Sequence, residues 1–319
     1  MTNRRWIVWT VIGGLFIVLA IAGYLALFSD EKVEKKKISV LLNESMDDRW
    51  VIVKEGMEQA ATDYDAELNI VLTDRIANSN EQQNLILREI EGGTNGIVLE
   101  PVAGVGLSNF IGEHQGNVAI TLIGSDLTPQ NVYDCVAPDS FEMGKVLGKT
   151  FVEDYENSQT KPVIGVFASA SPNYAAEQCM KGFMEEIEYS NGVLRFDPDS
   201  KMSDEILDEI NHEGIDVLVA FESRMTEKLV DFVANAGFES LPRVYGTGYS
   251  QKAIYYLDKG IVSKLVLTNE FNLGYLAVES SATKQSPRGL KYPEMEIYVV
   301  DRNNLYDEAF QKILFPLVQ

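Results

Sequence analysis

Short apolar runs alternate with amphipathic stretches along most of this chain, from Ile38 onward. The runs have the length of strands, are rich in Val and Ile and lack polar alternation, which is typical of parallel strands buried on both faces. Nine runs are expected as strands: residues 38–42, 68–72, 96–99, 118–123, 163–167, 216–221, 243–246, 262–267 and 296–300. Seven stretches between them are expected as helices: residues 49–63, 81–91, 141–155, 174–188, 204–212, 225–236 and 274–283.

This alternation predicts an α/β fold with doubly wound parallel sheets. The strands before and after about Asp139 form two similar sets, which favours two Rossmann-like lobes. A length of 319 residues also suits about two domains. Glycines fall at the seams between elements, such as Gly92-Gly93, Gly192, Gly214 and Gly237, where helix C-caps are expected.

A different pattern opens the chain: residues 6–28 carry no charge and follow Arg4 and Arg5. At 1.5 Å per residue a helix of this length spans a bilayer core of about 30 Å. Trp6, Trp9 and Tyr24 lie near its ends, where amphipathic rings prefer the membrane interface. The pattern predicts a tail at 1–5, a single transmembrane helix at 6–28 and a charged tether at 29–37.

The alternative for this segment is a cleaved signal peptide with Ala20-Ile21-Ala22 as the cleavage motif. The apolar run continues past Ala22 and exceeds the roughly 7–15 residues of a cleaved apolar region, which favours a retained anchor. No cysteine lies nearby to carry a lipid. Cations flank both ends of the segment, so charge alone leaves its orientation open.

Charge narrows the possible partners. The net charge is −21, and residues 38–319 carry 21 cations against 45 acids, or −24. Such a surface repels phosphate backbones, so a nucleic-acid-binding role is not expected. No Gly-x-x-x-x-Gly-Lys, Gly-x-Ser-x-Gly or Cys-x-x-Cys motif is present, and no cofactor is implied.

Histidine and cysteine are scarce. His114 and His212 lie 98 residues apart, which disfavours a histidine-based metal site or a catalytic triad. Cys135 and Cys179 are compatible with one disulfide, but two buried thiols are favoured. Without a nucleophile–base set, an enzyme such as a surface hydrolase is disfavoured.

Five stretches, in this order, carry a resemblance to a known family. They are residues 38–42 leading to 49–56, residues 84–86 through 96–101, residues 139–144, residues 175–183 and residues 268–275. They include Lys54-Glu55-Gly56, Glu100-Pro101, Gly144, Gly182-Phe183 and Gly274-Tyr275. The order resembles the type I periplasmic binding proteins, and within them the ribose-type sugar-binding proteins, over about residues 37–300.

The resemblance implies two lobes joined by three crossings, near Ala137, Thr268 and Val299. The N-lobe is then 38–137 with 268–298, and the C-lobe is 138–267 with 299–319. The fold implies an extracytoplasmic soluble domain, which resolves the orientation: the tail at 1–5 is cytoplasmic and the chain is a single-pass protein of the cell membrane. Related lactose-type repressors carry a DNA-binding segment in front, where this chain has its apolar helix.

Matching the family's ligand positions implies a site at the carboxyl ends of strands. Where the family often has Asn-Pro-Phe-Phe, this chain has Asp47-Asp48-Arg49-Trp50, and Trp50 is expected either as a stacking platform or as a buried core residue. The family's other sugar partners are replaced. The matched positions are Asp47, Arg49, Trp50, Ser125, Asp126, Asp139, Glu177, Glu222, Tyr249 and Thr268.

Several replacements are acidic, namely Asp47, Asp126, Glu177 and Glu222. Buried carboxylates need a compensating charge, so they imply a cationic ligand, a metal, or Arg49 or Arg224 as partner. The alternatives are solvated acids in an open cleft, and for Asp47 and Asp48 helix N-caps.

The resemblance favours a binding protein over the other function class considered, an enzyme such as a surface hydrolase. The favoured one is a membrane-tethered binding protein that closes its lobes over a sugar or other small polar solute. It would deliver the solute to an ABC-type permease or report it to a membrane sensor kinase.

Overall fold

The computed structural model describes residues 2–27, 35–42, 48–72, 76, 78–102, 105–114, 116, 118–124, 134–159, 161–169, 174–187, 192–196, 204–238, 240–283 and 295–315. The chain divides into two compact units, Met1–Lys35 and Lys36–Gln319. Each unit is described by itself.

The first unit consists of helix α1 (Thr2–Leu27). Large apolar side chains, among them Trp6, Leu15 and Phe16, are exposed along it. Counting only residues that the structure describes, no helix has the apolar length of a membrane span. The predicted span at 6–28 therefore stays a prediction.

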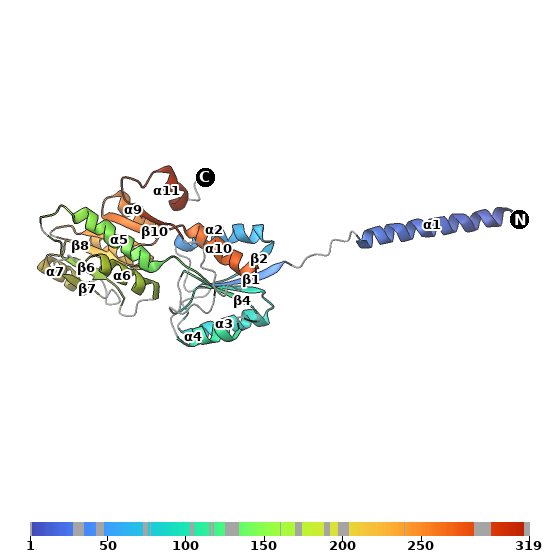
Figure 1. The fold of residues 1–319 in the computed structure, drawn as a ribbon, viewed down its shortest axis with the longest axis horizontal. Coiled ribbons are helices and arrows are strands. Elements are labelled where there is room, and N and C mark those ends of the chain that lie inside the picture. The colour runs from blue at the N-terminus through green and yellow to red at the C-terminus, as the bar shows by residue number, and fades with distance from the viewer. Residues whose placement is uncertain are drawn as a thin grey trace. The chain divides into compact units, whose positions relative to one another are not determined.

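A five-stranded parallel sheet organises the first half of the second unit (Figure 1). Its order is β2-β1-β3-β4-β5. The strands are β1 (Lys36–Leu42), β2 (Ala66–Leu72), β3 (Gly96–Leu99), β4 (Ala119–Ile123) and β5 (Asp134–Val136). With it pack α2 (Asp48–Asp63), α3 (Ser79–Glu91), α4 (Val105–His114) and α10 (Glu270–Thr283). We call this group the N-terminal lobe.

Strand residues of the N-terminal lobe point alternately into two apolar cores. Val40 and Val98 join the core under α2 and α10, whereas Leu41, Ile97 and Leu99 join the core under α3 and α4. Figure 1 shows these two pairs of helices on opposite sides of the sheet. Both faces of the sheet are therefore covered. This is why the strands read as continuous apolar runs.

A six-stranded sheet organises the other half, in the order β11-β10-β9-β8-β6-β7. Its strands are β6 (Ile164–Phe167), β7 (Val193–Phe196), β8 (Val217–Ala220), β9 (Arg243–Thr247), β10 (Val262–Thr268) and β11 (Ile297–Val300). All pairs are parallel except β10 with β11. Around it pack α5 (Ser140–Tyr155), α6 (Tyr174–Glu186), α7 (Asp204–Glu213), α8 (Ser223–Asn235), α9 (Gln251–Asp258) and α11 (Glu308–Leu314). We call this group the C-terminal lobe.

One helix pair in each lobe packs backbone against backbone. In the N-terminal lobe, a methyl group at Gly56 of α2 would overlap the carbonyl oxygen of Phe271, and one at Gly274 of α10 would overlap that of Val53. Glycine is required at both positions because only its lack of a side chain permits this approach.

The C-terminal lobe repeats this arrangement. A methyl group at Gly144 of α5 would overlap the carbonyl oxygen of Cys179, and one at Gly182 of α6 would overlap that of Phe141. In both lobes each contacted carbonyl lies three residues before the partner glycine. Contact between helices therefore explains why these four positions are glycine.

Side-chain caps define several helix starts. Asn78 accepts a hydrogen bond from the Glu81 amide at 3.1 Å, and Ser250 accepts one from the Ala253 amide at 3.4 Å. At the other end of a helix, Gly214 adopts φ +62° directly after α7, as expected for a C-cap glycine.

All nine expected strands and all seven expected helices are present, with ends shifted by a few residues. The elements that the pattern did not predict are β5, β7, α4, α9 and α11. β5 has only three residues, and β7 is an edge strand interrupted by the exposed Arg195, so neither forms a continuous apolar run. β11 joins the second sheet from Ile297, two residues before the expected boundary at 299.

Candidate functional site

The topology of each sheet marks one place for a ligand. In the first sheet β1 lies between β2 and β3, and in the second β6 lies between β7 and β8. At these positions the strand order reverses, and ligands of open α/β sheets bind outside the carboxyl ends of the strands there. The two candidate half-sites are thus the ends of β1, β3 and β4, and the ends of β6 and β8.

The C-terminal lobe has a small hollow at its half-site. Residues that follow or end β6 and β8, together with residues of α6 and α8, line it: Phe167, Ala168, Ser169, Ala176, Met180, Phe221, Glu222 and Met225. Its volume of about 10 Å³ is the space of about one water molecule. The hollow is mainly apolar, with the Glu222 carboxylate and Ser169 as its polar groups.

Glu222 is the residue immediately before α8. Its backbone carbonyl accepts a hydrogen bond from the Thr226 amide, but its side chain does not cap the helix. Thr226 instead donates its hydroxyl to the carbonyl oxygens of Glu222 and Thr247. Glu222 is thus a residue of the hollow whose carboxylate does not cap α8.

The N-terminal lobe places an ion pair at its half-site. Arg49 Nε of α2 lies 2.9 Å from a carboxylate oxygen of Glu270, the first residue of α10. The Glu270 side chain is 6% exposed and that of Arg49 is 21% exposed. The guanidinium also lies 5.1 Å from the centre of the Trp50 ring.

Gly124, which follows β4, shapes the same place. It has φ +79°, and a side chain on it would begin 3.2 Å from a terminal nitrogen of Arg49. Both the backbone conformation and the close guanidinium favour glycine here. The Arg49 head group is thus held at the carboxyl end of β4.

Trp50 belongs to the core. Only 4% of its surface is exposed, and it packs with Val53, Met57 and Leu273 in the apolar core of the N-terminal lobe. Of the two roles expected from the sequence, core packing is the one that this burial supports.

Three other expected site residues have structural contacts. Tyr249 is buried and donates its hydroxyl to the Leu314 carbonyl at 3.0 Å. Asp139 caps α5 by accepting a hydrogen bond from the Glu142 amide at 2.9 Å. Glu177 pairs with Lys181 one turn along α6 at 2.8 Å, and it does not line the hollow.

The remaining expected positions are Thr268, Asp47, Ser125 and Asp126. Thr268 is buried at the end of β10, opposite Ile297 of β11. Asp47, Ser125 and Asp126 lie outside the described residues. The structure thus brings Arg49 together with Glu270, and Glu222 together with the β6 end, but it does not bring Glu177 to Glu222's hollow.

Glu270 and Ser169 are the site residues that sequence reasoning missed. Both follow a buried strand at its carboxyl end, which is the signal that marks a ligand edge in this fold. Neither residue matches a position where the family supplies a ligand contact, so the resemblance does not point to them.

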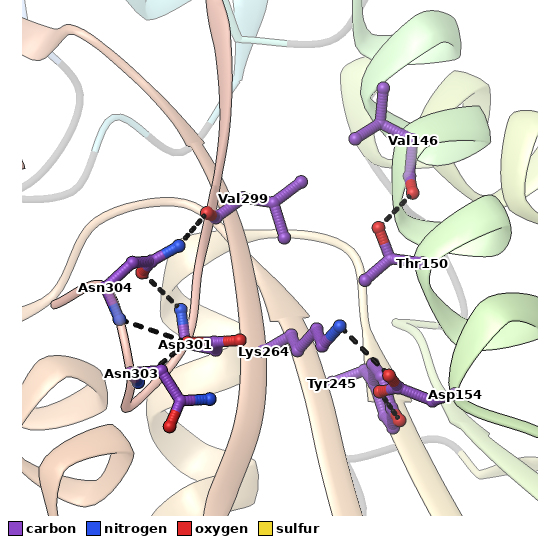
Figure 2. A network of polar contacts seen from close by, with 9 residues as sticks. All are labelled: Val146, Thr150, Asp154, Tyr245, Lys264, Val299, Asp301, Asn303 and Asn304. Carbon is purple, nitrogen blue, oxygen red and sulfur yellow. Dashed lines mark hydrogen bonds and ion pairs between the residues drawn. The ribbon is translucent and has the colours of Figure 1, made fainter.

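A second polar network lies within the C-terminal lobe, and Figure 2 shows it. Asp154 of α5 accepts a hydrogen bond from Tyr245 at 2.7 Å and pairs with Lys264 at 3.0 Å. Burial is the main cause that raises the pKa of Tyr245, so its hydroxyl stays protonated. The network joins α5 to β9 and β10, and a separate Asp301–Asn304 turn follows β11.

Cys135 and Cys179 are not joined in a disulfide, and of the two expected buried thiols only Cys179 is buried, since Cys135 is half-buried. Cys179 is buried, and burial raises the pKa of its thiol to about 12, which makes it unreactive at neutral pH. Within the described part of the chain, no group of three or more His, Cys, Asp or Glu side chains is placed to hold a metal ion.

Comparison with known proteins decides the family. The family model described as "Periplasmic binding protein domain" matches residues 38–285. The chain belongs to this family. The match extends from β1 to the end of α10 and so includes both half-sites.

Solved structures support a type I fold of this family. GanP, a glucose-galactose binding protein from Geobacillus stearothermophilus, is 18% identical with a TM-score of 0.72, covering 86% of this chain and 99% of that one. A carbohydrate transporter solute binding protein from Agrobacterium radiobacter, in complex with D-arabinose, is 15% identical with a TM-score of 0.76, covering 89% and 100%.

A third structure contains two proteins. A chain of the XylFII-LytSN complex is 18% identical with a TM-score of 0.70, covering 84% of this chain and 98% of that one. The comparison of this chain with curated proteins found no match.

Proposed function

We propose that this chain is a membrane-tethered extracytoplasmic solute-binding protein that takes a sugar or another small polar solute for an ABC-type transporter. Its place in the periplasmic binding protein family supports binding rather than catalysis. GanP is named as a glucose-galactose binding protein, and the Agrobacterium structure contains D-arabinose, which supports a sugar as the solute class.

The observation that carries this proposal is the matching position of two half-sites that each contain polar side chains. Arg49 and Glu270 lie at the end of β4 in one lobe, and Glu222 and Ser169 lie at the ends of β8 and β6 in the other. In the proposed mechanism the lobes close by a hinge motion, so that one solute contacts both half-sites and is shielded from water.

We assign the ligand contacts to Arg49, Glu222 and Ser169, and we retain Asp47, Ser125, Asp126 and Thr268 from the family positions. The contacts of Trp50, Tyr249, Asp139 and Glu177 support structural roles instead. Because Lys181 compensates Glu177, the case for a cationic ligand rests on Glu222 and on the retained Asp47 and Asp126.

The proposed anchor is the uncharged run at 6–28, with residues 1–5 in the cytoplasm and 29–37 as a tether. The exposure of Trp6, Leu15, Phe16 and Tyr24 on α1 supports it, since an apolar surface on a helix favours lipid. Protease added to spheroplasts is expected to remove the binding domain and leave the helix. Release of a domain that begins near Gly23 would contradict the anchor.

A second candidate is a sensing role, in which the closed form binds a membrane sensor kinase. The XylFII-LytSN complex favours it, because a protein of similar fold is there bound to another protein. Co-purification of the full chain with a kinase, dependent on added sugar, would support sensing. Sugar-dependent co-purification with a permease would support transport.

Ligand binding is tested on the full chain in detergent or nanodiscs. D-glucose, D-galactose, D-arabinose, amines and nucleosides are compared by thermal shift, followed by calorimetry. A ligand that binds only the folded chain stabilises it by about 2.7 kcal/mol at 100 times its Kd. The melting temperature rises as a result. A neutral sugar is expected to do so without turnover.

Two matched variants sharpen this test. Glu222→Gln is expected to change the affinity, whereas Glu177→Gln is not, because only Glu222 lines the hollow. Equal effects of both variants, or no shift by any probe, would contradict the proposal.

A further inference from the structure

The ion pair of the N-terminal half-site has a consequence for ligand charge. We infer that Glu270 sets the specificity of the site: it positions Arg49 and neutralises its charge, so that the site takes uncharged, oxygen-rich sugars and discriminates against sugar acids. This inference rests on the proposed function.

Glu270 is too deeply placed to be a solvated surface acid. Its side chain is 6% exposed. The residue is the first of α10, two positions after the end of β10. A carboxylate removed from water in this way needs a charged or hydrogen-bonding partner. Arg49 provides one, with Nε at 2.9 Å from the carboxylate.

Arg49 is held from three sides. Glu270 binds its Nε, the Trp50 ring lies 5.1 Å below the guanidinium, and Gly124 lies beside a terminal nitrogen. Trp50 is itself fixed in the core. With 21% of the Arg49 side chain exposed, the guanidinium reaches the solvent edge of the half-site in a fixed orientation.

The charges decide which ligands this arrangement favours. An isolated guanidinium would bind a carboxylate by a charge-assisted, bidentate pair. Here Glu270 already balances the positive charge, and Glu222 adds a negative charge at the other half-site. A neutral hydroxyl can accept a hydrogen bond from Arg49, whereas a sugar carboxylate would approach the fixed carboxylate of Glu270 and the negative charge of Glu222.

The test uses pairs of sugars that differ only by a carboxylate at C6: D-galactose with D-galacturonate, and D-glucose with D-glucuronate. Calorimetry is performed on the full chain, on Glu270→Gln and on the double variant Arg49→Gln/Glu270→Gln. Glu270→Gln keeps the shape and removes the charge. The double variant is the matched control, because it removes both charges and leaves no buried ion.

We expect Glu270→Gln to improve the affinity for the uronate relative to the neutral sugar by at least about 10-fold, the size of one charge-assisted hydrogen bond. The double variant is expected to lose this gain and to bind the neutral sugar about 10-fold more weakly than the unaltered chain. Melting curves of all three proteins establish that each is folded.

Different results overturn different claims. If the unaltered chain binds the neutral sugar but Glu270→Gln leaves the ratio of affinities unchanged, the inference is wrong and the proposed function stands. If the double variant shows the same uronate gain as Glu270→Gln, Arg49 is not the group that Glu270 controls. If the unaltered chain binds neither member of either pair, the proposed function fails and the inference with it.

Discussion

The two lobes use the same scaffold to hold different chemistry. Each has a parallel sheet with a reversal of strand order, and each has one helix pair packed through reciprocal glycines, Gly56 with Gly274 and Gly144 with Gly182. At the carboxyl ends of the strands they differ. The N-terminal lobe holds a compensated ion pair there, and the C-terminal lobe a mainly apolar hollow lined in part by Glu222.

This difference separates what the fold requires from what a ligand requires. The glycine contacts lie within the lobes and follow from helix packing, so they recur in both. The strand ends face the proposed solute, and nothing in packing makes them alike. A change inside the shared scaffold is therefore expected to alter stability, and a change at the strand ends to alter binding.

The largest effect is expected from Trp50→Ala and from Phe183→Ala, the corresponding test in the other lobe. Both rings are buried beside the glycine-packed helices, so each change should lower the free energy of unfolding by about 4 kcal/mol in denaturant titration. Leu241→Ala, at an exposed position, serves as control and should change it little. A stable Trp50→Ala protein that only loses ligand affinity would restore the platform role of Trp50.

Gly56→Ala and Gly182→Ala test the shared helix contact. In each, the added methyl group meets a backbone carbonyl, and the helices must separate, which should cost about 3 kcal/mol in both lobes. Gly112→Ala on α4 is the matched control, because no atom lies within 4 Å of its methyl group. This control should be neutral or stabilising by roughly 0.5–1 kcal/mol. Tolerance of alanine in one lobe alone would show that the symmetry is only apparent.

Two acids, the partly exposed Asp154 and the buried Asp134, provide a third contrast. In the C-terminal lobe Asp154 has Tyr245 and Lys264 as partners, whereas in the N-terminal lobe burial raises the pKa of Asp134 to about 6, from 3.8. Between these pH values the folded chain holds a proton that the unfolded chain has lost. Stability therefore falls as the pH rises through this window, and the loss is complete above about pH 6.

Asp134→Asn should accordingly stabilise the chain by about 2 kcal/mol at pH 7.5 and by almost nothing at pH 3.5. Melting curves at both pH values measure the difference. An equal effect at the two pH values would mean that the charge of Asp134 is not the cause.

The smallest effect concerns the exposed pair Glu177–Lys181. Both side chains are about half exposed, so Glu177→Gln should change the free energy of unfolding by less than about 0.5 kcal/mol. A salt titration of the melting temperature on the variant and the unaltered chain measures it. A larger loss would show that this ion pair stabilises α6, and the exposed Lys54–Glu58 pair of α2 would then need the same test.

Much of the scaffold could be predicted from the sequence because both sides of each sheet are covered. Strands such as β1 and β8 therefore read as continuous apolar runs, and amphipathic helices separate them. β5 has only three residues, and β7 lies at the edge of its sheet with Arg195 exposed, so neither reads as a continuous apolar run.

The site was less predictable. Glu222 and Arg49 are predicted only through the resemblance, as matches to the family's ligand positions after a strand and at the start of a helix. The partner of Arg49 is not predicted, since Glu270 lies 221 residues away and only the second crossing of the chain, near Thr268, brings it close. Glu177 was expected in the site by position alone, but its helix neighbour Lys181 compensates it.

The central claim is that one solute contacts the strand ends of both lobes. Hydrogen exchange of the full chain, with and without a saturating amount of whichever of D-glucose, D-galactose and D-arabinose gives the largest thermal shift, tests it most directly. A solute that contacts both lobes should slow amide exchange at residues 48–56 and 119–124 of the N-terminal lobe and also at residues 164–169 and 221–226 of the C-terminal lobe. Slower exchange in one lobe alone, or no change at either half-site while the sugar binds, would contradict it.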